Sequence, residues 1–399
     1  MFLEILLAVA LGILAGVFTG LIPGVHVNLI TVLILGLTSS FLSLPSVLFA
    51  VFIIALALTH SFLDSIPSIF LGAPDESMVV AVLPGHQLLN KGLGHKAVVY
   101  TLIGSLSALI FCLLLFPYAY KYLVLISDFV VPFLPYVLIL VIFVLLFLSH
   151  NFFPNLFFFL LSGVLGLISF QLFDQRNILL PLLSGLFGVS TLLLSLSSTS
   201  SFPRQFFSRR LIDVSFDDIF RNSSRASVFG SLASFLPGLG SSQAAIVAST
   251  TMKKKSPKDY LLLVGGINTV NFVFSILTIV ILGKARNGAI VGVNRLFSTL
   301  SMNHFFLFIS VVLIAAGIAV PLGLLLSRWF ARNVVRVNYS VLIYSVVLFI
   351  SFLVIVFSGL QGLLILLTAS SLGLLANFVG VQKNMLLGCL LFPVIIYLL

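Results

Sequence analysis

The stretch GVFTGLIPGVHVN at residues 16–28 sets a Pro-Gly pair between two apolar segments that would otherwise continue as one helix. A second stretch, GSLASFLPGLGSS at residues 230–242, sets another Pro-Gly pair 214 positions later (230 − 16). Proline lacks a backbone N–H and clashes with the preceding turn, so each pair is expected to interrupt a helix. SIFLGAPDES at 68–77 and TIVILGKARNG at 278–288 match after a small gap. This recurrence predicts a chain of two related halves.

The composition is that of an integral membrane protein. Of 399 residues, 60% are hydrophobic and 8% are charged, which leaves too few polar groups to cover a folded surface in water. Many apolar runs reach the roughly 20 residues that a spanning helix needs. The predicted fold class is therefore an all-α integral membrane protein, multi-pass in the cell (cytoplasmic) membrane.

Ten long apolar runs are candidate spans, and they fall into two groups of five. A shorter broken element precedes each group, at about 12–40 and at 229–251. Only eight helical residues precede the second Pro-Gly pair, and eight residues rise about 12 Å, less than half a bilayer. Both elements are therefore predicted to be re-entrant helical hairpins. The spans are expected at 47–70, 97–118, 131–149, 154–173 and 178–198, and at 261–282, 304–326, 339–358, 360–378 and 384–398.

These elements divide the chain into a first repeat at 1–200, a linker at 201–228 and a second repeat at 229–399. A hairpin returns the chain to its own side, whereas five spans leave it on the other side, so the repeats are predicted to have inverted topology. Basic residues flank the second hairpin and place both of its ends in the cytoplasm. The basic linker is interpreted either as an amphipathic helix on the membrane surface or as a connection that anchors orientation.

The two hairpin tips are the candidate substrate site. Irregular backbone at membrane depth is tolerated only where protein or a water-filled cavity satisfies it, and inverted repeats with interrupted helices are the recurring construction of secondary transporters. Helix N-termini after each Pro-Gly pair would favour an anion. Proline kinks stabilised by neighbouring helices are the alternative. The candidate residues are Pro23, Gly24, Val25, His26, Val27 and Asn28, and Pro237, Gly238, Leu239, Gly240, Ser241, Ser242 and Gln243.

Ionisable residues within apolar surroundings are candidates for cation coupling or a polar path. His60 and Asp64 are four positions apart and would share a helical face, which favours a proton or sodium coupling pair. Asp75 and Glu76 are further coupling candidates or caps of the next helix. In the matching place of the second half, GKARNG supplies Lys284 and Arg286, interpreted as contacts for the anion or as a solvated loop. The amides at Asn268, Asn271, Asn294 and Asn303, with His304, are interpreted as a polar path or as interhelical hydrogen bonds.

Several other classes of function lack their signatures. Cys112 and Cys389 stand singly in apolar runs, so neither a disulfide nor a metal site is predicted. The net charge of +10 is better explained by membrane orientation than by nucleic acid. Walker A, HExxH and GxSxG sequences are absent, so neither ATP hydrolysis nor an intramembrane enzyme is expected.

The quoted residues resemble the TctA family, the large permease subunit of the tripartite tricarboxylate transporters. That family carries a Pro-Gly hairpin near the start of each half and a stretch similar to S-x-I-L-x-N-I-P-G-E followed by L-D-G-Y-P-x-A-x-x-G-x-A-G. The corresponding stretch here is SIPSIFLGAPDESMVVAVLPGHQLLNKGLGHKAV at 65–98. Pro-Gly-Glu has become Pro-Asp-Glu, and the Gly-Gly-Ser that precedes it is missing. The resemblance carries over Pro23, Gly24, Pro74, Glu76, Gly85, Gly92, Pro237 and Gly238.

The resemblance implies a twofold architecture over most of the chain, and a small membrane subunit and an extracytoplasmic binding protein as partners. With the residue analysis, it predicts a secondary active transporter of an organic anion of the carboxylate class. Transport would follow alternating access, coupled to Na⁺ or H⁺ and without a bound cofactor. The alternative is a translocase for the lipid carrier polyprenyl phosphate, because such translocases also use paired Pro-Gly hairpins. Membrane lipids are expected neighbours, and a homodimer is left open.

Overall fold

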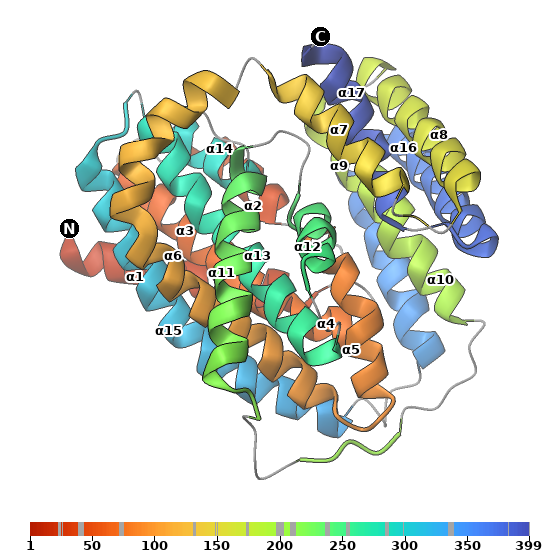
Figure 1. The fold of residues 1–399 in the computed structure, drawn as a ribbon, viewed down its shortest axis with the longest axis horizontal. Coiled ribbons are helices and arrows are strands. Elements are labelled where there is room, and N and C mark those ends of the chain that lie inside the picture. The colour runs from red at the N-terminus through yellow and green to blue at the C-terminus, as the bar shows by residue number, and fades with distance from the viewer. Residues whose placement is uncertain are drawn as a thin grey trace.

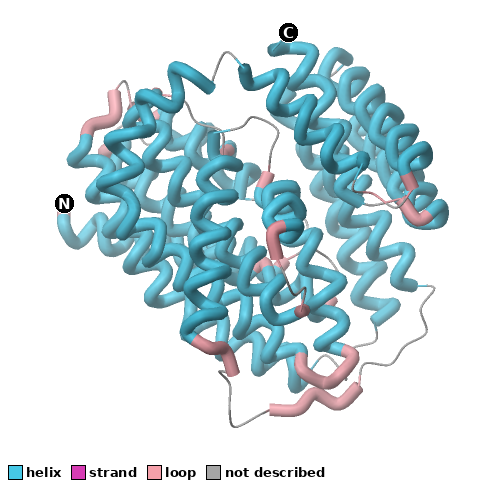
Figure 2. Tube along the Cα trace, in the orientation of Figure 1, coloured by secondary structure: helices cyan, strands magenta, loops and turns pink. Residues whose placement is uncertain are grey.

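A computed structural model describes residues 1–22, 25, 27–38, 44–71, 76–130, 133–147, 149, 151–172, 175–196, 203–207, 213–235, 240–252, 256–283, 287–297, 299–333, 339–381 and 383–398. All regular elements in these ranges are helices (Figure 2). Seven of the described helices are long and apolar enough to cross a membrane. The predicted all-α membrane fold class is confirmed.

The helices form two bundles, each with its own apolar core (Figure 1). The first bundle contains α1 (Phe2–Leu21), α2 (Val27–Thr38), α3 (Ser46–Leu63), α4 (Ser65–Phe70), the 3₁₀ helix η1 (Glu76–Ala81), α5 (Val82–Leu89), α6 (Gly94–Val130), α11 (Phe216–Phe235), α12 (Ser241–Thr250), α13 (Pro257–Leu282), α14 (Gly288–Arg295) and α15 (Met302–Asn333).

The second bundle contains α7 (Leu134–Phe147), α8 (Phe152–Leu172), α9 (Gln175–Leu183), the π-helix η3 (Ser184–Val189), α10 (Ser190–Leu196), α16 (Tyr339–Val379), the 3₁₀ helix η5 (Lys383–Leu387) and α17 (Gly388–Leu398). In Figure 1 this bundle occupies the upper right, and α12 lies between the two bundles. Ile246 and Val247 of α12 pack against the core of the second bundle. The short helix α12 therefore contacts both bundles.

Helix bounds recur at the spacing of the two Pro-Gly pairs. α1 and α11 begin at Phe2 and Phe216, and both their first and their last residues differ by 214 (216 − 2 and 235 − 21). α2 and α12 begin at Val27 and Ser241, again 214 apart (241 − 27). Each short helix leads into a long buried helix, α3 or α13. The division into two repeats and their inverted sense both stay predictions.

Two element bounds differ from the sequence-based expectation. The first broken element is expected at 12–40, but α1 already begins at Phe2 and is a candidate span of 20 residues. The second is expected at 229–251, but α11 begins at Phe216, inside the expected linker. Ser215 explains this start, because its hydroxyl accepts from the backbone N–H of Asp218 while the Asp218 carboxylate accepts from the Ser215 N–H. This capping box begins the helix before the apolar run does.

The short arms are therefore α2 and α12, with 12 and 10 residues. At about 1.5 Å per residue, both are too short to span a bilayer, whereas a 20-residue helix such as α1 rises about 30 Å. The runs expected at 339–358 and 360–378 form α16, where Gly359 breaks the helical backbone with φ 63° and ψ −165°. The break falls at the expected boundary between the two spans.

The two halves meet along α6 and α13, whose backbones approach closely. A Cβ atom at Gly104 of α6 would collide with the carbonyl of Leu262 on α13. A Cβ atom at Gly265 of α13 would collide with the carbonyl of Thr101 on α6. Small residues permit such close helix packing in membranes. This contact positions α13 along its axis relative to α6 in the first half. α13 carries the side-chain amides of the candidate site.

Candidate functional site

The structure describes part of the predicted site. Val25, Val27, Asn28, His60, Asp64, Gly240, Ser241 and Ser242 are described, as are the backbones of Glu76 and Gln243, whose side chains lie outside the description. The remaining candidates, with Pro74 from the family resemblance, lie outside the described residues: Pro23, Gly24, His26, Asp75, Pro237, Gly238, Leu239, Lys284 and Arg286.

Asp64 is a buried carboxylate at the junction of α3 and α4. Its side chain is 2% exposed, and its backbone ends α3 and precedes α4. Oδ2 of Asp64 accepts a hydrogen bond from Ser77 Oγ at 3.1 Å and another from Asn268 Nδ2 at 3.0 Å. Ser77 belongs to η1 and Asn268 to α13, so this carboxylate joins elements from both halves. A buried carboxylate at membrane depth is costly, and such residues are functional candidates.

Asn268 continues the contact to the second hairpin. Its Nδ2 also lies 3.4 Å from the carbonyl oxygen of Ser61, and its Oδ1 accepts from Ser241 Oγ at 3.4 Å. Ser241 Oγ in turn accepts from Asn271 Nδ2 at 3.0 Å. Ser241 is the first residue of α12. We call Asp64, Ser77, Ser241, Asn268 and Asn271 the Asp64 cluster.

Sequence reasoning finds Asp64, Ser241, Asn268 and Asn271 as candidates, but it misses Ser77 and the association of all five residues. Asn268 and Asn271 are three apart and so share a face of α13, and they interrupt an otherwise apolar run. That spacing is the signal for a polar face. Asn268 bonds Asp64, 204 positions away in sequence, and Asn271 bonds Ser241, 30 positions away. No local pattern indicates which helices these amides face.

His60 contacts a different helix. Its Nδ1 lies 3.0 Å from Thr19 Oγ1 of α1, and the imidazole is 7% exposed. The hydrogen bonds described for Asp64 lead instead to η1 and α13. The predicted one-turn spacing of His60 and Asp64 is present, and the two side chains reach toward both hairpin regions from the same end of α3.

The start of α2, which belongs to the first predicted hairpin, packs against α14. Asn28, the second residue of α2, is so close to Gly288 that a Cβ atom there would collide with Asn28 Oδ1. Asn287 caps α14, because its side chain accepts from the backbone N–H of Ala289 at 3.0 Å. One turn along α2, a Cβ atom at Gly292 would collide with Thr31. The N-terminal ends of α2 and α14 are therefore adjacent.

Two contact regions, which we call seams, each join a short helix of one half to a short helix of the other half. The α2–α14 seam joins the first hairpin helix to the second half, and the α12–η1 seam joins the second hairpin helix to the first half. The α12–η1 seam contains the carboxylate of Asp64. The described parts of α2 and α14 carry no acidic residue. Among the described residues, the α2–α14 seam therefore has no carboxylate, whereas the α12–η1 seam has that of Asp64.

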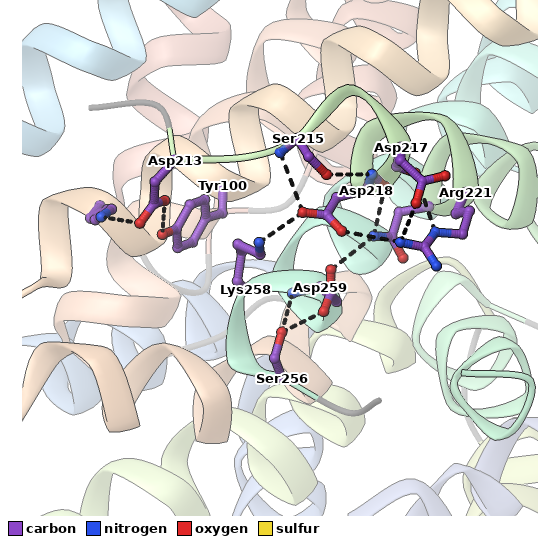
Figure 3. A network of polar contacts seen from close by, with 11 residues as sticks. Tyr100, Asp213, Ser215, Asp217, Asp218, Arg221, Ser256, Lys258 and Asp259 are labelled. Carbon is purple, nitrogen blue, oxygen red and sulfur yellow. Dashed lines mark hydrogen bonds and ion pairs between the residues drawn. The ribbon is translucent and has the colours of Figure 1, made fainter. Parts of the chain in front are cut away.

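A separate polar network holds the end of the linker against the first bundle (Figure 3). Asp213 accepts from Lys96 Nζ and from Tyr100 Oη, both at 2.6 Å. Lys258 of α13 donates to Asp218 of α11 at 2.8 Å. Burial alone would raise the pKa of Asp213, but the hydrogen bonds from Lys96 and Tyr100 together outweigh it and lower that pKa below its ordinary value. The network connects α6, α11 and α13.

The linker also contacts the turn before α6. Gln205 accepts from the backbone N–H of Gly94 at 2.9 Å, and the backbone N–H of Phe206 donates to the carbonyl of Gly92 at 2.8 Å. Gly92 has φ 74°, a left-handed conformation that favours glycine, and the Phe206 ring fills the space where a Cβ atom would lie. This accounts physically for one glycine of the family resemblance.

Comparison with known proteins agrees with this architecture. The model of the Tripartite tricarboxylate transporter TctA family matches residues 6–388. The chain belongs to the TctA family. As a TctA-family chain it is a membrane transport protein, related to the permease subunit of a tripartite system.

A curated relative is the uncharacterized protein MJ1079 of Methanocaldococcus jannaschii, with 31% identity over 410 aligned positions that cover 99% of each chain. No solved structure matches the TctA-family chain. Among the described residues, no group of three or more His, Cys, Asp or Glu side chains is placed to hold a metal ion. Cys112 and Cys389 are both buried.

Proposed function

We propose that this TctA-family chain is the permease of a secondary active transporter that moves an organic anion of the carboxylate class across the cytoplasmic membrane. Movement follows alternating access and is coupled to Na⁺ or H⁺. The observation that carries the proposal is the Asp64 carboxylate, buried and hydrogen-bonded across the two halves at the start of a short hairpin helix. A cation that neutralises this charge is a direct means of coupling.

The proposed place of the anion is the α2–α14 seam. Two helix N-termini are adjacent there, Asn28 and Asn287 supply amide groups, and neither described helix carries an acidic residue. Helix N-termini stabilise anions through free N–H groups and the helix dipole. In sequence, Lys284 and Arg286 directly precede α14, and they would add positive charge. The second seam already holds a carboxylate, which disfavours a second anion at the same point.

The family relationship also supports a small membrane subunit and an extracytoplasmic binding protein as partners in this proposal. In a tripartite arrangement, the binding protein captures the anion outside and delivers it to the permease. The chain has no Walker A sequence, which is consistent with transport driven by an ion gradient.

Uptake into proteoliposomes tests the proposal. Labelled citrate and succinate serve as tricarboxylate and dicarboxylate probes, with an inward Na⁺ gradient, an inward proton gradient or no gradient. Accumulation above the equilibrium level under one gradient is the expected result. Movement of a polyprenyl phosphate between leaflets, with no uptake of either carboxylate, would contradict the carboxylate assignment and support the lipid-carrier alternative.

A further inference from the structure

The hydrogen bonds of the Asp64 cluster form a chain with one direction. A charged carboxylate only accepts hydrogen bonds, so Asn268 presents its NH₂ group to Asp64 and its carbonyl oxygen to Ser241. Ser241 donates to that oxygen and accepts from Asn271 Nδ2. Every donor in the chain points toward Asp64. The Asp64 carboxylate is the nearer acceptor of the Asn268 NH₂ group, at 3.0 Å against 3.4 Å for the carbonyl oxygen of Ser61, and its charge makes it the stronger of the two in orienting the amide and the hydroxyl beyond it.

We propose that Asn268 is a positioning residue that transmits the charge state of Asp64 to the start of α12. When a proton or a monovalent cation neutralises Asp64, the strong acceptor that holds the Asn268 NH₂ group weakens. The amide then loses its preferred orientation, and Ser241 loses the acceptor that holds the first turn of α12. This inference rests on the proposed function and deepens it, because it connects the coupling carboxylate to one hairpin.

The residues of this hydrogen-bond chain are buried, which strengthens the coupling between Asp64 and α12. The side chains of Asp64, Ser241 and Asn268 are 2%, 4% and 7% exposed. Water is therefore a poor substitute for a lost partner, and a buried polar group left unsatisfied is costly. Because Ile246 and Val247 of α12 pack against the second bundle, a shift of α12 also reaches that bundle.

Several other titratable groups lie on the surrounding elements. The nearest along the chain is His60, one turn before Asp64 on α3. α12 carries none. The others on the helices packed around α3 and α4 are Glu4 on α1, Glu76 on η1, His86 on α5, His95, Lys96, Tyr100, Cys112, Tyr118, Tyr120, Lys121, Tyr122 and Asp128 on α6, Lys258, Asp259 and Tyr260 on α13, Arg295 on α14, and His304, Arg328 and Arg332 on α15. The sodium arm of the test therefore keeps pH fixed, and His60→Gln serves as a background variant.

Hydrogen–deuterium exchange of residues 241–250 measures the connection in full-length protein in lipid nanodiscs. Asp64→Asn mimics neutralisation and is expected to lower the protection of α12 about tenfold, since a hydrogen bond to a charged group is among the stronger ones. In an Asn268→Leu background, Asp64→Asn is expected to change that protection less than twofold. Thr278→Val, which removes a buried hydroxyl that donates to the carbonyl oxygen of Ser275 in the same helix, is the matched control and should retain the tenfold effect.

An equal response to Asp64→Asn with and without Asn268 would overturn the proposal, as would no response in the native background. If Asn268→Leu does not fold, Ser241→Ala breaks the same chain at the next link, and Ser241→Thr should restore it because the hydroxyl is retained. Only a transmitting role predicts restoration by threonine together with a changed cation dependence.

Two cation arms identify the source of neutralisation. Exchange is compared in Na⁺ and in K⁺ at constant pH, and at low and neutral pH in K⁺ after correction for intrinsic exchange rates. One arm should reproduce the Asp64→Asn response, and it should do so in His60→Gln as well. If neither does, the proposal is overturned. Absence of citrate uptake under every gradient would instead contradict the proposed function, because the exchange measurement needs no transported anion.

Discussion

Asn268 Nδ2 lies 3.0 Å from Asp64 Oδ2, so a side chain of the second half hydrogen-bonds the buried carboxylate of the first. The contact lies where the start of α12 meets the junction of α3 and α4. The close packing of α6 on α13 supports it. The Asp64 carboxylate therefore contacts both halves of the chain. A cation that neutralises this carboxylate changes its contacts with both halves.

Replacing Asp64 with asparagine should uncouple transport from the cation. The substitution keeps the shape of the side chain but removes its charge, so no proton or Na⁺ is needed to neutralise it. Gradient-driven citrate uptake is expected to fall at least about tenfold, a change equivalent to 1.4 kcal/mol, while exchange of citrate across the membrane persists. Asp259→Asn removes a carboxylate at the start of α13, in the network of Figure 3, and should leave the ion dependence unchanged. An unaltered ion dependence in Asp64→Asn would remove this carboxylate from the coupling mechanism.

Replacing Asn28 with aspartate should weaken binding of the anion. The change is nearly isosteric, but it puts a negative charge beside the N-termini of α2 and α14, where the substrate carboxylate is proposed to bind. The KM for citrate is expected to rise at least about tenfold, because like charges repel each other at short range. Thr31→Val, one turn further along α2, removes a hydroxyl that bonds to the carbonyl of Val27 and serves as the control. A KM that stays within a factor of two would place the anion elsewhere.

Replacing Gly104 with alanine should destabilise the contact between the halves. The added methyl group would collide with the backbone carbonyl of Leu262, which has little freedom to move because it belongs to α13. We expect a loss of about 1–3 kcal/mol, the usual cost of overpacking, measured by thermal unfolding in detergent. Gly317→Ala is the matched control, because at this position of α15 no heavy atom of another described segment lies within 4 Å of the added Cβ. Equal unfolding temperatures for the two variants would contradict the close packing of α6 on α13.

Parts of the fold that depend on local chemistry were predictable from sequence. The Pro-Gly pairs mark the ends of α1 and α11 because proline acts on its own turn. The start of α11 at Phe216 was not predicted from sequence, because the first turns of this helix are polar and depend on the cap at Ser215. Hydropathy recognises only the apolar part of such a helix.

The candidate site shows the same limit. His60 and Asp64 stand out because charge is rare in this sequence. The association of Asp64 with Asn268 depends on how α13 packs in the first bundle, which brings together residues 204 positions apart. Such a contact is set by tertiary packing and has no local sequence signal.

Replacing Asp213 with asparagine should make stability less dependent on acid pH. Lys96 and Tyr100 hold the pKa of Asp213 below its ordinary value of 3.8, in spite of the burial that opposes this. Because the folded-state pKa is lowered, the carboxylate stabilises the native protein above the unfolded-state pKa, and that stability is lost as pH falls through the folded-state value. At neutral pH the variant should therefore unfold slightly more easily than the native protein, by less than about 1 kcal/mol because the pair is partly solvated. The difference should shrink as pH falls below about 4, near the ordinary pKa of an aspartate. Thermal unfolding in detergent between acid and neutral pH measures this. The control is Asp217→Asn, which removes an exposed carboxylate paired with Arg221. A difference that is constant across the pH range would show that the ion pair does not hold the linker.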